Sequence, residues 1–225
     1  MLSFMIKAII FDLDNTLIDF MKMKRVACEQ AIDAMIDAGL SLDRKDALDK
    51  LYNIYFQEGL EDPEIFQKFL KKITGQVNYR ELAHGIVAYR EARTGFLKPY
   101  PGTKKTLKRL KAKGLSLAIV SDAPKLKAWI RLVNMGIDDL FDIVIAYEDT
   151  LEKKPSPKPF LLALEKLGLN PDECLMIGDM PQKDMKGAKD LYIKTCFARY
   201  GFDGKDPIVE TDYVIDSIED LEKII

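Results

Sequence analysis

The sequence predicts an α/β protein: a three-layer core built on a parallel sheet, with a separate helical domain inserted into it. Three observations support this fold class. Short apolar runs of strand length recur along the chain, segments with helical periodicity alternate with them, and one long block after the first run shows no strand pattern. Alternation of strands and helices is typical of a doubly wound parallel sheet with helices on both faces.

Six apolar runs have the length and composition of buried parallel strands. They cover residues 6–11, 115–120, 143–146, 174–177, 193–197 and 213–215. Segments with helical periodicity precede, separate or follow the later runs. They cover residues 103–113, 125–134, 157–167 and 217–223. Gly114 and Gly168 stand where glycine commonly ends a helix, and Pro124 stands at a helix start.

The block from residue 20 to residue 96 interrupts this alternation. Four amphipathic helical segments are expected there, at 26–38, 44–56, 64–73 and 79–93. The proline-containing stretch 98–102 is the expected return to the core. The predicted domains are therefore a core of residues 1–19 and 97–225, and a four-helix domain of residues 20–96.

The composition argues against several classes of protein. The chain has 225 residues and a net charge of only −2, and its basic runs alternate with apolar residues at helical spacing, so no nucleic-acid partner is expected. Residues 1–11 are apolar apart from Ser3 and Lys7 but too short to span a bilayer, and they lead directly into Asp12, so a core strand and no membrane partner are expected. The three cysteines form no CxxC pair, which argues against zinc or redox chemistry and favours a reducing cytoplasm.

Polar residues follow the strand-like runs at the points where the sheet should meet solvent. The first run leads into Asp12 and Asp14, the second into Ser121, and the fourth into Asp179, with Asp184 shortly after. Lys154 lies between the third and fourth runs, within Lys-Pro-Ser-Pro. Ligands of doubly wound sheets bind outside the carboxyl ends of the strands, so a site is expected at this edge.

These residue types suit phosphoryl transfer. The Asp12 carboxylate can attack phosphorus to form an aspartyl-phosphate, and Asp14, two residues on and on the same side of an extended chain, can act as general acid and base. Clustered carboxylates require a cation, and Mg²⁺ prefers such oxygen ligands. Ser121 can donate a hydrogen bond to a phosphoryl oxygen, and Lys154 can neutralise charge. Taken singly, each of these residues also fits an ordinary turn, helix cap or solvated loop.

The order of these motifs resembles the haloacid dehalogenase superfamily. The matching residues are Asp12-Leu-Asp-Asn-Thr-Leu17, Ser121, Lys154-Pro-Ser-Pro-Lys-Pro-Phe160 and Gly178-Asp-Met-Pro-Gln-Lys-Asp184. The likeness covers nearly the whole chain and includes the helical insert. Within the superfamily, the chain is similar to the members with a helical cap after the first strand. It looks most like small archaeal and bacterial phosphatases acting on sugar phosphates or glyceraldehyde 3-phosphate.

The resemblance implies a Rossmann-like core, a four-helix-bundle cap and a Mg²⁺-dependent phosphatase of a small phosphorylated metabolite. It implies Asp12 as nucleophile, Asp14 as acid/base, Ser121 for phosphoryl binding and Lys154 for charge stabilisation. The same resemblance assigns the metal to Asp12, to Asp179 and to the backbone carbonyl of Asp14, with Asp184 supporting it. The Lys-Pro-x-Pro spacing favours Lys154 over its neighbour Lys158.

Other functions of the superfamily are the alternatives. A 2-haloacid dehalogenase lacks the second Asp of the first motif, whereas this chain has Asp14. A phosphohexomutase often carries a cap histidine at the position where this chain has Lys24, and the single histidine, His84, is expected to be structural or at the surface. A non-catalytic binding protein would have lost Asp12 or Asp14. The sequence identifies neither the substrate nor the oligomeric state.

Overall fold

A computed structural model describes residues 5–204, 207 and 209–225 of the chain, and residues 1–4 of the apolar N-terminal run lie outside this description. The chain divides into two compact units: a core unit of Met1–Asp19 and Lys98–Ile225, and a helical unit of Phe20–Leu97. Leu97 lies in the helical unit because its buried side chain and its N–H bond to the Arg93 carbonyl continue the last helix. Within the described residues, none of the helices combines the length and apolar character needed to cross a bilayer.

The core unit contains a six-stranded parallel sheet, as the sequence predicts. Its strands are β1 (Ala8–Phe11), β2 (Ser116–Val120), β3 (Ile143–Ile145), β4 (Cys174–Gly178), β5 (Lys194–Ala198) and β6 (Tyr213–Ile215). They are arranged in the order β3-β2-β1-β4-β5-β6. Phe11 pairs with Ile119 on β2 and with Ile177 on β4. The carboxyl ends of these three neighbouring strands therefore lie level, which brings their polar extensions together.

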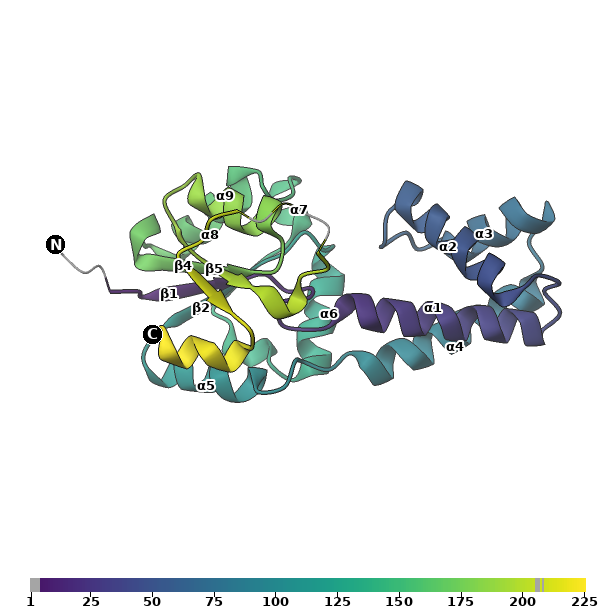
Figure 1. The fold of residues 1–225 in the computed structure, drawn as a ribbon, viewed down its shortest axis with the longest axis horizontal. Helices are drawn as coiled ribbons and strands as arrows, with labels where there is room; N and C mark the ends of the chain where they lie inside the picture. The colour runs from purple at the N-terminus through teal and green to yellow at the C-terminus, as the bar shows by residue number, and fades with distance from the viewer. Residues whose placement is uncertain (1–4, 205–206, 208) are drawn as a thin grey trace. The chain divides into compact units, whose positions relative to one another are not determined.

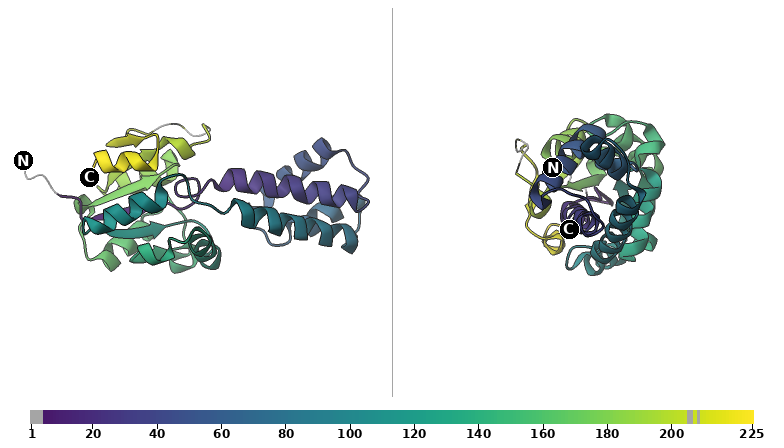
Figure 2. Two further views of the ribbon diagram at one scale, coloured as in Figure 1. Left: turned by 90° about the horizontal axis from the view of Figure 1, so that it is seen from below. Right: turned by 90° about the vertical axis from the view of Figure 1, so that its right-hand side faces the viewer.

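Helices cover both faces of the sheet (Figures 1 and 2). Alternate strand residues such as Ala8 and Ile10 share a buried cluster with Phe160 of α8 (Pro157–Leu167) and Ala188 of α9 (Lys186–Lys189). The opposite face is covered by α5 (Thr103–Ala112), α6 (Lys125–Met135) and the 3₁₀ helix η5 (Ile218–Lys223). The remaining short elements are η1 (Asp138–Leu140), α7 (Tyr147–Thr150), η2 (Pro171–Glu173), the π-helical turn η3 (Pro181–Met185) and η4 (Arg199–Gly201).

The helical unit consists of four helices. They are α1 (Phe20–Asp37), α2 (Arg44–Glu58), α3 (Ile65–Thr74) and α4 (Tyr79–Phe96), and α1 and α4 lie side by side (Figure 1). Asp43 and Asn78 cap α2 and α4 by accepting hydrogen bonds from first-turn N–H groups. Helix α1 begins at Phe20, earlier than the expected residue 26, because Phe20, Met23 and Lys24 already lie on its buried face.

Lys24 is held inside the helical unit. Its Nζ donates to the Leu60 carbonyl oxygen at 2.6 Å and to the Tyr89 hydroxyl at 3.0 Å, and it lies 4.1 Å from the centre of the Tyr55 ring. These contacts give Lys24 a structural role in the packing of the four helices. His84 is exposed on α4, where it lines a shallow pocket with residues of α1 and α4.

Candidate active site

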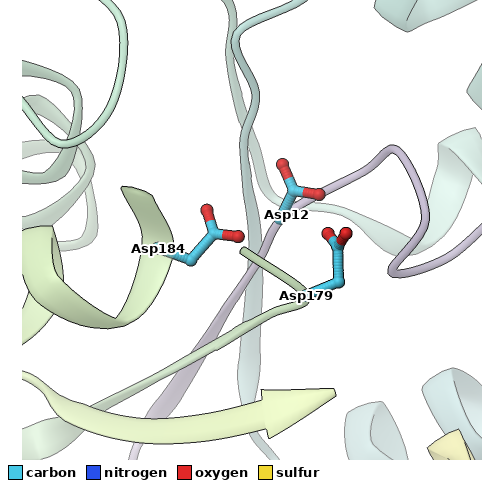
Figure 3. A group of neighbouring side chains, drawn as sticks. All are labelled: Asp12, Asp179 and Asp184. Atoms are coloured by element: carbon cyan, nitrogen blue, oxygen red, sulfur yellow. The ribbon is translucent and has the colours of Figure 1, made fainter. Parts of the chain in front are cut away.

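Three aspartates gather at the carboxyl edge of the sheet. Asp12 follows β1, and its N–H donates to the Ile177 carbonyl on β4 at 2.8 Å, which ties the two strand ends together. Asp179 follows β4, and Asp184 lies on η3. One carboxylate oxygen from each residue lies within 4.8 Å of the others, and all three residues are buried (Figure 3). The structure thus brings the Asp12 carboxylate together with two carboxylates that lie more than 160 residues later in the sequence.

Lys154 contacts two of these three carboxylates. Its Nζ lies 2.5 Å from Asp12 Oδ1 and 2.7 Å from Asp184 Oδ1, and donates to the Val120 carbonyl oxygen at 2.9 Å. Asp122, just beyond β2, accepts a hydrogen bond from the Lys154 N–H at 2.9 Å. This bond fixes the lysine loop to the end of β2.

Lys158, the rival lysine of the same motif, has a different environment. Its side chain is 61 % exposed and forms an ion pair with Glu152, whereas the Lys154 side chain is 3 % exposed. The geometry therefore places Lys154 beside Asp12, and Lys158 on the surface.

The electrostatics of the site show an excess of negative charge. Burial raises the pKa of Asp179 to about 9, and repulsion from Asp12 and Asp184 adds to the effect. Burial likewise raises the pKa of Asp184 to about 6, although Lys154 acts in the opposite direction. Burial alone would lower the pKa of Lys154, but attraction by Asp12, Asp184 and Asp122 outweighs it and raises that pKa. Three carboxylates facing one ammonium group form a site that fits a divalent cation.

Two local features hold the Asp179 and Asp184 carboxylates in place. The Thr16 hydroxyl donates to Asp179 Oδ1 at 3.2 Å, and the Met180 N–H donates to Asp184 Oδ2 at 3.0 Å. Gly178 permits Asp184 to pack directly over the strand end, because a Cβ at this position would lie 2.3 Å from Asp184 Oδ2. A side chain at residue 178 would therefore displace the Asp184 carboxylate.

Asp14 lies beside a residue that the motifs do not include. Its Oδ2 accepts a hydrogen bond from Arg131 Nη1 at 2.9 Å, and Arg131 is buried on α6. A signal for this residue is present in the sequence, because Arg131 shares the buried helical face of Ala128, Leu132 and Met135. The expected metal contact of Asp14 uses its backbone carbonyl, and it stays a prediction.

Ser121 lies buried at the end of β2. Its N–H donates to the Ile145 carbonyl at 3.0 Å, and its Oγ accepts a hydrogen bond from the Ala123 N–H at 3.2 Å. This backbone anchoring holds the hydroxyl at the same sheet edge as the aspartates.

The turn after Asp14 is braced by the segment that follows β5. The Tyr200 hydroxyl donates to the Thr16 carbonyl at 2.7 Å, and a Cβ on Gly201 would lie only 1.8 Å from the Asn15 carbonyl oxygen. The Tyr200 ring also packs edge-on against Tyr100, with ring centres 5.0 Å apart. We find no sequence motif that would have singled out Tyr200 or Gly201.

Comparison with known proteins supplies the family. A family model described as haloacid dehalogenase-like hydrolase matches residues 6–191. The chain belongs to the haloacid dehalogenase-like hydrolase family. The resemblance seen in the motifs is therefore confirmed, and its order of Asp12, Ser121, Lys154 and Asp179 runs through the matched region.

Named phosphatases resemble the chain over most of its length. A glyceraldehyde 3-phosphate phosphatase of Methanocaldococcus jannaschii is 35 % identical over 98 % of this chain and 97 % of its own. Another from Pyrococcus furiosus is 35 % identical over 87 % of this chain and 82 % of its own. The crystal structure of a haloacid dehalogenase-family phosphatase from Thermococcus onnurineus matches with a TM-score of 0.70, 27 % identity and 97 % coverage of both chains. These relatives and the family identify the chain as an enzyme, a phosphatase.

Proposed function

We propose that this phosphatase hydrolyses a small phosphorylated metabolite, with glyceraldehyde 3-phosphate as the first candidate, through a phosphoenzyme formed on Asp12. The observation that carries the proposal is the buried Asp12 carboxylate, held against Lys154 and beside Asp179 and Asp184. The near full-length similarity to the glyceraldehyde 3-phosphate phosphatase of M. jannaschii supports this choice of substrate.

The metal of the proposal is Mg²⁺. Asp12, Asp179 and Asp184 would hold it with the Asp14 carbonyl, since all four groups offer the hard oxygen ligands that Mg²⁺ prefers. When bound, Mg²⁺ would neutralise the charge of the phosphoryl oxygens and of the clustered carboxylates.

The proposed reaction uses these side chains in two steps. An Asp12 carboxylate oxygen attacks phosphorus, the bond between phosphorus and the ester oxygen breaks, and Asp14 gives its proton to that leaving oxygen. Lys154 and Ser121 hold the phosphoryl oxygens during this transfer. Asp14 then takes a proton from a water molecule that attacks the same phosphorus, and the bond between phosphorus and the Asp12 oxygen breaks. Inorganic phosphate leaves, and the free Asp12 carboxylate is restored.

The proposed location is the cytoplasm. Cys28, Cys174 and Cys196 are all buried free thiols. Free cysteines without a disulfide framework are typical of a reducing compartment.

The proposed function is tested with a panel of phosphate esters. Phosphate release is measured with glyceraldehyde 3-phosphate, phosphoglycolate, glucose 6-phosphate and p-nitrophenyl phosphate, each with Mg²⁺ and with excess EDTA. We expect glyceraldehyde 3-phosphate to give the highest kcat/KM, and EDTA to remove activity on every ester. Chloride release from 2-chloropropionate, measured in parallel, is expected to be absent. Full phosphatase activity in EDTA, or efficient chloride release, would contradict the proposal.

A second expected result concerns the pH dependence of metal binding. In the metal-free protein the pKa of Asp184 is raised to about 6 and that of Asp179 to about 9, so both hold protons that an unfolded chain would release at lower pH. Proton binding by these two carboxyl groups stabilises the folded state at low pH, and this stabilisation is lost as pH rises through their raised pKa values. A metal ion competes with the same protons for the carboxylates. The increase in Tm caused by Mg²⁺ should therefore be larger at about pH 8 than at about pH 5.

The measurement is thermal unfolding of the wild type and of Asp179→Ala with and without Mg²⁺. Asp179→Ala should lose most of the Mg²⁺ effect, because it removes one carboxylate of the group. A Mg²⁺ effect that is the same at both pH values, or one that Asp179→Ala retains in full, would argue against this metal site.

A further inference from the structure

An arginine outside the recognised motifs contacts the proposed acid/base. Arg131 Nη1 lies 2.9 Å from Asp14 Oδ2, and the two side chains are 6 % and 25 % exposed. Asp14 follows β1, and Arg131 comes from the middle of α6, a helix that the motif analysis left without any catalytic residue. The contact therefore links the turn at residues 14–18 to a different layer of the core unit.

The position of Arg131 on its helix is unusual for a charged residue. It shares the buried face of α6 with Ala128, Leu132 and Met135. A guanidinium group in such a place loses hydration, a cost that a hydrogen-bonded carboxylate partner offsets. By contrast, Arg109 and Arg199 pair with carboxylates at the surface, with side chains 51 % and 59 % exposed. The Arg131 pair thus combines a buried guanidinium with a partly buried carboxylate, and that carboxylate is the proposed acid/base.

We propose that Arg131 is a positioning residue for Asp14, holding the carboxylate in the orientation from which it protonates the leaving oxygen. The inference rests on the acid/base role of Asp14 in the proposed function. The Asp14–Ile18 bridge and the left-handed Asn15 fix the backbone of the turn, and the hydrogen bond from Arg131 acts on the Asp14 carboxylate itself. The guanidinium, held in the packed face of α6, restricts rotation of this carboxylate.

Orientation of this carboxylate matters for one class of substrate more than another. An alkyl phosphate has an alkoxide leaving group, a strong base that requires a proton in the transition state. p-Nitrophenolate is a weak base and departs without one. Because misplacement of a catalytic group by about 1 Å can cost about 10²-fold in rate, a loosened Asp14 should slow alkyl esters selectively. The loss should appear in kcat rather than in KM, since Arg131 acts on the transition state through Asp14.

The experiment compares kcat/KM for glyceraldehyde 3-phosphate with kcat/KM for p-nitrophenyl phosphate in each variant. This ratio does not depend on the fraction of folded enzyme, so a destabilised variant still gives an interpretable result. The variants are Arg131→Met, which removes the donor, and Arg131→Lys, which keeps a positive donor. Arg109→Met is the matched control, because it removes an arginine–carboxylate pair from the surface of the same unit. Asp14→Asn is measured first, to establish how large the selective loss is when the acid itself is absent.

We expect Arg131→Met to lower the ratio by about tenfold or more, in the same direction as Asp14→Asn. The loss should lie in kcat for glyceraldehyde 3-phosphate and not in KM. Arg131→Lys should recover the ratio to within about threefold of wild type, and Arg109→Met should leave it unchanged. If Asp14→Asn lowers the ratio and Arg131→Met does not, Arg131 is structural and the inference is wrong while the proposed function stands. If Asp14→Asn itself leaves the ratio unchanged, the acid/base role fails and the inference falls with it.

Discussion

Replacing Asp12 with asparagine should reduce kcat/KM to below about one per cent of the wild-type value, a loss of at least about 2.7 kcal/mol of transition-state stabilisation. Asparagine keeps the shape of the side chain but lacks the anionic oxygen that attacks phosphorus. The loss should be equally severe for glyceraldehyde 3-phosphate and for p-nitrophenyl phosphate, because both require the nucleophile. This pattern would differ from the selective loss expected of Asp14→Asn.

The fold of the Asp12→Asn variant should survive, because the substitution removes one of three crowded carboxylates while Lys154 keeps its ion pair with Asp184. Circular dichroism and thermal unfolding check this directly. Asp190→Asn, at an exposed position after α9, is the matched control and should retain full activity. If Asp12→Asn kept more than about one per cent of activity while Asp190→Asn behaved as wild type, the nucleophile would have to be another residue.

Lys154→Met is expected to damage both activity and stability. The substitution leaves Asp12 and Asp184 buried without the ammonium group that lies 2.5 Å and 2.7 Å from them. Removing one partner of a buried ion pair typically costs about 3–5 kcal/mol of stability, because the remaining charge is uncompensated. Losing the cation beside the phosphoryl group should also lower kcat by about 10²–10³-fold or more.

Lys158→Met provides the matched control for this lysine. It lies in the same segment and also loses an ion pair, but at an exposed position. We expect it to change the free energy of unfolding by less than about 1 kcal/mol and to leave kcat unchanged. Mg²⁺ should restore part of the Tm of Lys154→Met, because a divalent cation offsets the same excess of negative charge, but it should not restore the rate. Greater damage from Lys158→Met than from Lys154→Met would show that the two lysines had been assigned the wrong way round.

The strands are predictable from the sequence because parallel strands covered on both faces must be apolar throughout. Each predicted run contains an observed strand or overlaps it closely, from Ala8–Phe11 to Tyr213–Ile215. Short polar elements are not predictable in this way, because they lack an apolar run. The π-helical turn Pro181–Met185 and helix α9 (Lys186–Lys189) are too short to show a periodic apolar pattern. The last helix differs from the expected segment 217–223 in type: Ile218–Lys223 forms a 3₁₀ helix and not an α-helix.

For the site, the residue types that follow each strand predict the chemistry, but the order of the strands decides which of them meet. The structure brings Asp12, Asp179, Asp184 and Lys154 together because β1 lies between β2 and β4, an order that the alternation of elements does not reveal. Contacts from outside the motifs are harder to foresee. Arg131 is detectable as a charged residue on an apolar helix face. Tyr200 is not, because its hydrogen bond to the Thr16 carbonyl depends on where the segment after β5 lies in the folded core.

The brace from Tyr200 and Gly201 to the turn at Asn15 and Thr16 has a consequence for how the enzyme is made. The turn at residues 14–18 is synthesised before the residues that pack against it, because Tyr200 lies 184 positions after Thr16. Domains fold as units during synthesis, at about 5–20 residues per second. A nascent chain that already contains Asp12, Lys154, Asp179 and Asp184 therefore still lacks the Tyr200 and Gly201 contacts with this turn, and we expect hydrolytic activity to arise only after the segment that follows β5 has been made.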